Sequence, residues 1–473
     1  MVMERGARAR AAIETVDADT APEAAVVSFS HAAAPAILES SRPGEPYGRF
    51  SVFACDPFKV IEVRGGAAPL DAFAERLRAY PRMEPPPELP FAGGWIGALT
   101  YEAGLTLEGV APAASDDLRL PFLRFGLYDA AALFDHAKAQ WYAAAVDWPE
   151  PIRDRRPSVR TRLDELKRRL AAPVPDCFEE PPAPTASDPA PNLSRAAYLE
   201  RVTRAKEHIA AGDIYQVNLT QRFAARTSLS PTDLYRRLRS STPSSHAAFL
   251  QWGDTVILSA SPELFLSLRG DRVVTRPIKG TRPRTGDAVC DAAAAVDLAE
   301  SGKERAELNM IVDLLRNDLG RVCAYGSVRV ADAGSIEHHP TVIHRTATIE
   351  GRLEQGRGWL DLLRACFPGG SVTGAPKIRA MQIISELEPT VRGVYCGSIG
   401  WIGLDGSMSL NVAIRTMVQR RDVVHVHAGG AIVADSEPVA EYEETLTKAA
   451  GMFRALGCRS RPESAARPLL TTL

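Results

Sequence analysis

The sequence predicts a protein of mixed strands and helices, in two parts joined by a proline-rich segment. The first part, residues 22–147, contains strand-like stretches around turns, such as FSVFACDPFKVIEV at 50–63. The second part, from 194 to about 457, alternates strand and helix patterns. With 473 residues, 45% of them hydrophobic and 24% charged, the chain can form several domains or one large elaborated domain.

Composition and charge argue against several classes of partner. The formal net charge of -2 creates no global field that would attract nucleic acid or a membrane. No uninterrupted apolar run is long enough for a membrane span, and the N-terminus lacks the apolar core of a secretory signal. The 7 cysteines are scattered without a C-x-x-C pair, which favours reduced thiols over disulfides or a zinc site. We therefore expect a cytoplasmic protein.

The joining segment is predicted from its composition. Residues 172–193 are dense in proline and acid, so they can hold neither a helix nor an inner strand. Before them, residues 158–171 predict a basic amphipathic helix. After them, residues 194–213 predict a helix with Ser194 as its N-cap and Gly212 at its end.

The resulting organisation has five segments and no internal repeat. Both ends are expected to be frayed or disordered because of their composition. The segments are the N-terminal end 1–20, the N-terminal region 21–171, the linker 172–193, the main functional domain 194–457 and the tail 458–473.

Two predicted helices each carry two glutamates three residues apart. They are Glu304 and Glu307 in the first helix and Glu441 and Glu444 in the second. This spacing places both carboxylates on one helix face. Two such pairs facing each other would form an oxygen-rich pocket of the kind that Mg²⁺ prefers. A single pair is more commonly a solvated face, so the pairs alone are weak evidence.

A glycine-rich loop precedes another predicted helix in PGGSVTGAPKIRAM, residues 368–381. Free N–H groups at a helix start with Pro376 in its first turn suit a carboxylate or phosphate, and Lys377 would add charge. The order G-x-x-x-x-G-K-[ST] of a P-loop is absent. The alternative is an ordinary tight turn before a helix.

Three further positions indicate either a ligand or ordinary structure. Gly429 and Gly430 would let a ligand approach the backbone, or they form a bulge or turn. Arg415 lies among apolar neighbours and needs a carboxylate from the protein or from a ligand. His344 lies on a predicted strand, where most histidines are hydrogen-bonded core residues. Together, these patterns favour a magnesium enzyme acting on a small substrate with several carboxylates.

The stretch TRPIKGTRPR contains an unusual lysine, Lys279. A cluster of cations around one amine suits an amine that must lose its proton, or a site that holds an anion. The surrounding cations are Arg272, Arg276, Arg282 and Arg284.

Several motifs in order resemble the chorismate-utilising enzymes, which include anthranilate, aminodeoxychorismate, isochorismate and salicylate synthases. The clear resemblance covers residues 194–457, and residues 36–57 match more loosely. It implies an α+β fold of two packed antiparallel β-sheets flanked by helices, with chorismate and Mg²⁺ in a cleft between them. The motifs are ASPELFL, RPIKGTRPR, ERAELNMIVDLLRNDLGRV, FPGGSVTGAPKIRAM, YCGSIGWIG and HAGGAIVADSEPVAEYEET.

The same resemblance implies a role for each site residue. Glu263 would protonate the departing C4 hydroxyl, which requires a carboxyl that burial keeps protonated near neutral pH. The magnesium site would contain Glu304, Glu307, Glu441 and Glu444, with Glu307 and Glu444 as the direct ligands. The substrate carboxylates would be held by Tyr395, Arg415, Gly429, Gly430 and Lys448. Thr281, Ser371 and Thr373 would close the pocket, and His344 would lie beside the ring.

Two positions distinguish the branches of the family. Gln216 stands where the water-adding branches carry a basic lysine, and glutamine cannot act as a base. Lys279 stands where anthranilate synthases read P-I-A-G-T, and it resembles the nucleophile of the branch that makes 4-amino-4-deoxychorismate, a precursor of 4-aminobenzoate and folate. A nucleophilic lysine must be neutral, and cationic neighbours are expected to lower its pKa.

The resemblance also implies partners. Ammonia would come from a separate glutamine amidotransferase subunit, because no cysteine stands in a G-x-C-x-G context. Tryptophan binding stays open, since ILES at 37–40 is typical of the anthranilate branch but TPSSHAAFL at 242–250 departs from it. The alternatives are the anthranilate synthase large subunit and a non-catalytic relative that binds tryptophan or the amidotransferase.

Overall fold

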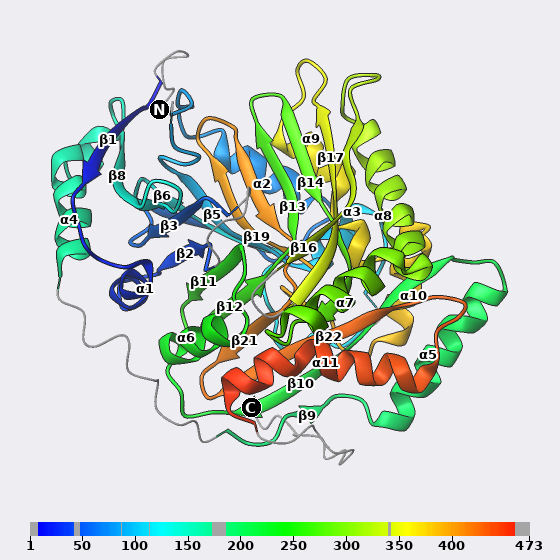
Figure 1. The fold of residues 1–473 in the computed structure, drawn as a ribbon. Coiled ribbons are helices and arrows are strands. Elements are labelled where there is room, and N and C mark those ends of the chain that lie inside the picture. The colour runs from blue at the N-terminus through cyan, green and yellow to red at the C-terminus, as the bar shows by residue number, and fades with distance from the viewer. Residues whose placement is uncertain are drawn as a thin grey trace.

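The computed structural model describes residues 8–41, 48–86, 88–112, 114–172, 186–338 and 342–458. Among these residues, the strands form two large sheets in which every named pair of strands is antiparallel, with helices outside them (Figure 1). Buried side chains from both sheets belong to one hydrophobic core, for example Leu219 in one sheet and Phe125 in the other. The predicted α+β class with two packed antiparallel sheets is confirmed.

The first sheet contains strands from most of the chain. In spatial order they are β1 (Arg10–Val16), β8 (Gln140–Asp147), β7 (Ala130–Asp135), β3 (Phe50–Ala54), β2 (Ala36–Glu39), β11 (His246–Trp252), β12 (Thr255–Ser261), β21 (Thr416–Arg420), β22 (Val423–Ile432), β10 (Gln216–Arg226) and β18 (Gly374–Ala375), with β9 (Ala190–Pro191) also paired to β10.

The second sheet is built in the same way. Its order is β15 (Ile278–Pro283), β17 (Val342–Arg352), β14 (Arg272–Arg276), β13 (Leu264–Arg269), β20 (Met408–Asn411), β19 (Ser398–Gly403), β5 (Gly94–Leu99), β6 (Leu123–Tyr128) and β4 (Lys59–Val63), with β16 (Arg329–His338) also paired to β17.

Helices lie around both ends of the molecule (Figure 1). Around the β1 end lie α1 (Pro22–Ser30) and α4 (Val159–Ala171), with the short helix η1 (Arg153–Arg155) before α4. Around the other end lie α5 (Arg195–Ala210), α7 (Ala288–Glu300), α8 (Gly302–Gly320), α10 (Lys377–Leu387) and α11 (Pro438–Leu456). The remaining helices are α2 (Pro69–Leu77), α3 (Tyr101–Leu107), α6 (Pro231–Ser241), α9 (Trp359–Cys366) and η2 (Gly370–Val372).

The two predicted parts of the chain share both sheets. Strand β2, from the N-terminal region, pairs with β11 from the main domain, and β5 pairs with β19 in the same way. The linker separates the two parts along the sequence, but it does not divide the sheets or the hydrophobic core into two. Residues 173–185 of the predicted linker lie outside the described residues, and β9 occupies part of its end.

The N-terminal end is more ordered than the sequence predicted. Residues 10–16, expected to be frayed, form β1 and pair with β8 along seven consecutive residues. An ion pair between Glu14 and Lys167 of α4 also attaches this strand to the helix. The expectation of disorder through residue 20 is wrong for this segment. Residues 1–7 and 459–473 lie outside the described residues.

The two helices beside the linker match their predictions. Ser158 caps α4 by accepting a hydrogen bond from the backbone of Thr161 at 3.1 Å. Ser194 caps α5 in the same way through the backbone of Ala197 at 3.2 Å. In the described part of the chain, no helix combines the length and apolar character needed to cross a membrane.

Candidate active site

The acid predicted to protonate the leaving hydroxyl lies in the turn between β12 and β13. Glu263 is 4% exposed, and its Oε1 accepts a hydrogen bond from the hydroxyl of Ser371 at 2.6 Å. Burial raises the pKa of Glu263 to about 7, against the opposing effects of Ser371, Lys279 and the backbone N–H of Ile278. A carboxyl with this pKa is substantially protonated at neutral pH, as a general acid must be.

Lys279 lies on β15 and faces the same loop. Its Nζ donates a hydrogen bond to the backbone carbonyl of Ser371 at 3.4 Å. Withdrawal from solvent lowers the pKa of Lys279, and the nearby ammonium of Lys448 lowers it further, while Glu307 and Glu263 oppose the shift. The structure thus brings the predicted nucleophile and the predicted acid to one residue, Ser371.

The arginines near Lys279 in sequence do not act as predicted. Each is neutralised by its own carboxylate, so none is a free cation beside the lysine, and the cationic neighbour that lowers its pKa is Lys448. The prediction was wrong because closeness along a strand does not tell which side chains meet in space. The pairs are Arg272 with Glu350, Arg276 with Glu337, Arg282 with Asp297 and Glu304, and Arg284 with Asp291.

The two glutamate pairs lie on α8 and α11, as the spacing predicted. Glu441 accepts a hydrogen bond from the Ser436 hydroxyl at 2.6 Å through Oε1, while its buried Oε2 has no partner among the described residues. Glu444 pairs with Lys448 at 2.7 Å. Burial raises the pKa of Glu307, and the charge of Glu444 raises it further, so the carboxylates of the two helices are near enough to repel each other.

This donor set suits Mg²⁺ in its chemistry. Mg²⁺ binds through a few carboxylate oxygens and completes its shell with water and anionic substrate. The unpartnered Oε2 of Glu441 and the mutual repulsion of Glu307 and Glu444 are features that a bound cation would relieve. In the described ranges, no three carboxylate, imidazole or thiol groups gather closely enough to form a metal cluster. The magnesium site therefore stays a prediction.

Lys303, at the start of α8, is a site residue that the sequence reasoning missed. Its charge opposes the burial that raises the pKa values of Glu441 and Glu307, and it helps to lower the pKa of Glu444. The signal was present in the sequence, since Lys303 and Glu307 stand at the i, i+4 spacing that puts side chains together on one helix face.

The two predicted glycines on β22 differ in what a larger side chain would contact. A Cβ on Gly429 would lie 2.1 Å from the carbonyl of Leu219, so the packing of β10 against β22 requires glycine there. A Cβ on Gly430 would lie 3.1 Å from Oε2 of Glu441, 3.5 Å from Glu444 and 3.7 Å from the amine of Lys448. Gly430 therefore leaves space where the predicted metal and carboxylate-binding side chains converge.

Arg415 has the surroundings expected of a ligand-binding arginine. Its guanidinium donates to the backbone carbonyl of Lys448, and no ion pair with a carboxylate is found for it within the described residues. Of the two alternatives left open by the sequence, a protein carboxylate is thus not seen, which favours a ligand carboxylate. Tyr395, also predicted to hold a carboxylate, has its ring stacked on His427 with centroids 5.1 Å apart.

The glycine-rich loop differs from its prediction in one respect. Lys377 donates to Asp318 at 2.5 Å and to the carbonyl of Cys366 at 3.2 Å, so it is a buried structural lysine and adds no charge to an anion site. The hydroxyl of Thr373 donates to the carbonyl of Gly369 at 3.1 Å and shapes the loop from within. Only Ser371 of the loop reaches Glu263 among the hydrogen bonds described.

Three further predicted site residues are Thr281, His344 and Gln216. Thr281 and His344 are hydrogen-bonded to each other at 2.9 Å, but the register sets Arg345, not His344, opposite Lys279. The position of His344 beside the substrate ring stays a prediction. Gln216 is fully buried, and neither end of its amide has a partner among the described residues, as expected for a side chain that holds a ligand or water.

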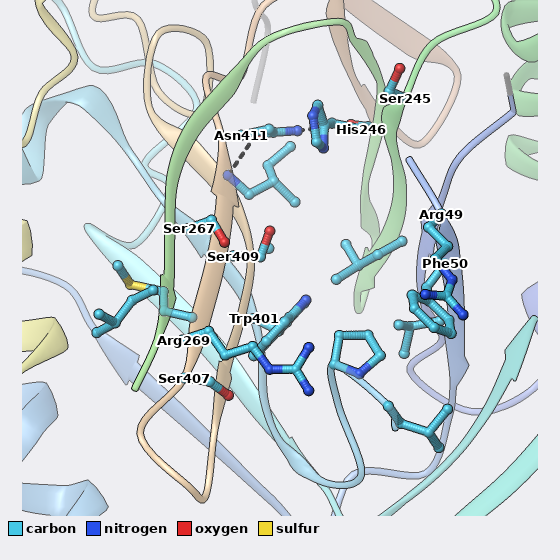
Figure 2. A pocket seen from close by; sticks show the side chains of 18 of the residues that line it. Arg49, Phe50, Ser245, His246, Ser267, Arg269, Trp401, Ser407, Ser409 and Asn411 are labelled. Atoms are coloured by element: carbon cyan, nitrogen blue, oxygen red, sulfur yellow. Dashed lines mark hydrogen bonds between the residues drawn. The ribbon is translucent and has the colours of Figure 1, made fainter. Parts of the chain in front are cut away.

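A cavity of about 320 Å³ lies between β2, β11 and β20 (Figure 2). It brings together the two segments compared with the tryptophan-binding branch, through Leu38 and Glu39 from one and Ser245 and His246 from the other. Asn411 joins the walls by donating to the carbonyl of His246 at 3.0 Å. Burial lowers the pKa of His246 to about 4, so the imidazole of His246 is uncharged at neutral pH.

Comparison with known proteins agrees with this geometry. The model of the chorismate binding enzyme family matches residues 34–454. Anthranilate synthase component 1 of Thermus thermophilus is 41% identical over 92% of this chain and 93% of its own length. Aminodeoxychorismate synthase component 1 of Salmonella typhimurium is 38% identical over 87% and 90% respectively. The crystal structure of anthranilate synthase component I from Streptococcus pneumoniae has a TM-score of 0.75 and 34% identity, covering 86% of this chain and 93% of that one. The chain belongs to the family of chorismate binding enzymes.

Proposed function

We propose that this chain converts chorismate and ammonia to 4-amino-4-deoxychorismate, as the first component of an aminodeoxychorismate synthase. The observation that carries the proposal is the meeting of Lys279 and Glu263 at Ser371, which accepts from the amine at 3.4 Å and donates to the carboxyl at 2.6 Å. One residue thereby aligns an amine whose pKa is lowered by burial with an acid that is partly protonated. A nucleophile and an acid held together are what an addition with loss of hydroxide needs.

The reaction follows from these two groups. The neutral amine of Lys279 attacks C2 of chorismate, the ring double bond shifts, and the C4 hydroxyl leaves as water with the proton of Glu263. Ammonia then bonds to C4, the double bond shifts back, and the C2–N bond breaks to release Lys279 as a neutral amine. The nitrogen on C4 returns one proton to Glu263, which restores the acid. The net change is gain of ammonia and loss of water. Arg415 would hold a substrate carboxylate while the buried position of Glu263 excludes water from the proton transfer.

We further propose that Glu304, Glu307, Glu441 and Glu444 hold Mg²⁺, with Glu307 and Glu444 as direct ligands. When bound, the ion would neutralise substrate carboxylate charge. We expect chelation by EDTA to abolish turnover and added Mg²⁺ to restore it. Glu444→Gln removes one carboxylate charge and should raise the Mg²⁺ concentration for half-maximal activity by about 10- to 100-fold.

The control for the magnesium prediction is Glu443→Gln, one position along α11. Successive helix residues point about 100° apart, so this variant removes the same charge from a different helix face. Its Mg²⁺ requirement should match that of the unaltered protein. Equal Mg²⁺ dependence in the Glu444→Gln variant, or full activity in EDTA, would contradict the proposed metal site.

The ammonia is proposed to come from a separate glutamine amidotransferase subunit. The purified chain should therefore use ammonium but not glutamine. With chorismate, Mg²⁺ and ammonium, we expect a product that becomes 4-aminobenzoate only after a lyase is added. Anthranilate and pyruvate as direct products would overturn the proposal, and no turnover of chorismate would favour a non-catalytic relative.

Anthranilate synthase component I is the second candidate function, and one observation favours it. Two relatives at 41% and 42% identity are named anthranilate synthase component 1, whereas four named aminodeoxychorismate synthase component 1 are at 37–38%. Differences of a few per cent over the whole chain do not report on the chemistry of one position. Lys279 favours the first candidate, and product analysis separates the two.

The cavity between β2, β11 and β20 is the proposed site for tryptophan. Its volume of about 320 Å³ and its mixed lining, in which Phe50 and Trp401 lie beside charged residues such as Arg49 and Arg269 (Figure 2), suit an amino acid with an aromatic side chain. We expect calorimetry to detect tryptophan binding without inhibition of turnover, since the segment at 242–250 departs from that of the regulated branch. Alanine, which lacks the indole, serves as the control ligand. Absence of binding heat, or inhibition of turnover by tryptophan, would contradict this proposal.

A further inference from the structure

A buried ion pair lies immediately behind the loop that carries Ser371. Arg392 is 2% exposed and Glu388 is 5% exposed. The guanidinium contacts both carboxylate oxygens, with Nε to Oε2 at 2.9 Å and Nη2 to Oε1 at 2.6 Å. Burying two charges costs desolvation free energy, which a pair offsets only when its remaining hydrogen bonds are also made.

The remaining hydrogen bonds of this pair join two elements of the active site. Arg392 donates from Nη1 to the carbonyl of Val372 in η2 at 2.9 Å and from Nη2 to the carbonyl of Asn218 in β10 at 2.6 Å. Glu388 Oε1 accepts from both the backbone N–H and the hydroxyl of Thr220 in β10, each at 2.9 Å. The pair therefore fastens the loop to the strand.

Val372 directly follows Ser371, the residue that meets both Lys279 and Glu263. We infer that Arg392 and Glu388 are positioning residues of the chorismate reaction, which set the place of Ser371 and thereby the alignment of the nucleophile with the acid. The pair touches neither group itself, so it acts through the loop. This inference rests on the proposed function only in taking Glu263 as the general acid.

The loop has a second attachment that separates positioning from folding. Strand β18 pairs with β10 through Gly374 and Ala375, and the backbone of Asn218 donates to the carbonyl of Thr373 at 2.8 Å. These contacts hold the far end of the loop without Arg392. Loss of the ion pair is therefore expected to release the carbonyl of Val372 and shift Ser371, while the sheet stays formed.

The test uses Arg392→Lys, which keeps the charge but not the forked contacts, and Glu388→Gln, which keeps the volume. We expect kcat to fall by about 100-fold, the loss typical of a displacement of about 1 Å, with little change in KM for chorismate. Activity is followed as chorismate consumption, with circular dichroism and the melting temperature as checks on folding.

The pH profile of activity should not change if the pair of Arg392 and Glu388 only stabilises the fold. Glu263 faces the Ser371 hydroxyl, the Lys279 amine and the backbone N–H of Ile278, and all three favour its ionised form. Displacing Ser371 removes one of them, so the alkaline limb of the profile should move to higher pH. Ser371→Ala should produce the same shift, and combining it with Arg392→Lys should add nothing to it.

Arg222→Lys is the matched control. Arg222 lies on β10 and contacts both oxygens of Asp117, at 2.8 Å and 2.5 Å, but it does not contact the loop in the described structure. Its variant should keep the alkaline limb in place. An unchanged limb and unchanged kcat in both test variants would overturn the inference, and so would loss of folding in both, which would make the pair a folding element. Failure of the proposed function would appear instead in the product of the unaltered protein.

Discussion

Replacing Lys279 with alanine is expected to lower the rate of 4-amino-4-deoxychorismate formation by at least about 10³-fold, because it removes the proposed nucleophile of the first step. The effect should fall on kcat, since Arg415 and Lys448, the proposed carboxylate-binding residues, would still hold the substrate. The substitution breaks one long hydrogen bond, which runs 3.4 Å from the Lys279 amine to the Ser371 carbonyl. Its loss should therefore have little effect on folding. Ammonium-dependent turnover at saturating chorismate measures the change.

The control for this prediction is Lys138→Ala. Lys138 forms an exposed ion pair with Glu88 at 3.4 Å, in the turn after β7. Exposed pairs of this kind contribute little to stability, so both turnover and melting temperature should stay unchanged. Retention of more than about a tenth of the activity in the Lys279→Ala variant would be too much for an essential nucleophile and would contradict the covalent mechanism.

Glu263→Gln is expected to lower kcat by about 10²- to 10⁴-fold, the usual contribution of a general acid. Glutamine has nearly the shape of glutamate and can still accept the hydrogen bond from Ser371, but it has no acidic proton to give to the leaving hydroxyl. The substitution therefore tests proton transfer with little change in packing. Rates of chorismate consumption at several pH values measure it.

The pH dependence follows from the same residue. The pKa of Glu263 is raised from 4.5 to about 7, and the reaction needs the protonated form, so activity should fall on the alkaline side as Glu263 loses its proton. On the acidic side, activity should fall as Lys279, whose pKa is lowered from 10.5, becomes protonated. The profile should be bell-shaped, and Glu263→Gln should lose the alkaline limb.

A second buried acid offers a control for the alkaline limb. Burial raises the pKa of Glu102 to about 7 as well, but its carboxylate accepts from the backbone of Arg392 and Gly393 and does not contact Lys279 or Ser371 in the described residues. Glu102→Gln should keep the limb. A limb that disappears in this variant and persists in Glu263→Gln would show that the wrong acid has been assigned.

Local features of the fold were predictable because their causes are local. The caps of α4 and α5 follow from a serine followed by helical periodicity, and the two glutamate pairs follow from an i, i+3 spacing. Strand β1 was missed because residues 10–16 acquire order only by pairing with β8, more than a hundred residues later. Pairing of this kind leaves no signal in the strand itself.

The site was predictable only in part, for the same reason. Nothing in the spacing of the chain brings Glu263 to Ser371, which is 108 residues away, and the resemblance to a family supplied that expectation. The arginines around Lys279 in the sequence predicted the correct direction of its pKa shift but the wrong cause. Burial and Lys448 lower that pKa. The neighbouring arginines do not, since each forms an ion pair with a carboxylate.

The most direct test of the account is to identify the protein atom bonded to the substrate. The chain is incubated with chorismate and Mg²⁺ but without ammonia, then digested and analysed by mass spectrometry. We predict a mass increase of one chorismate less one water, located on the peptide that contains Lys279 and absent from the Lys279→Ala variant. An unmodified Lys279, together with direct formation of anthranilate when ammonium is added, would contradict the account.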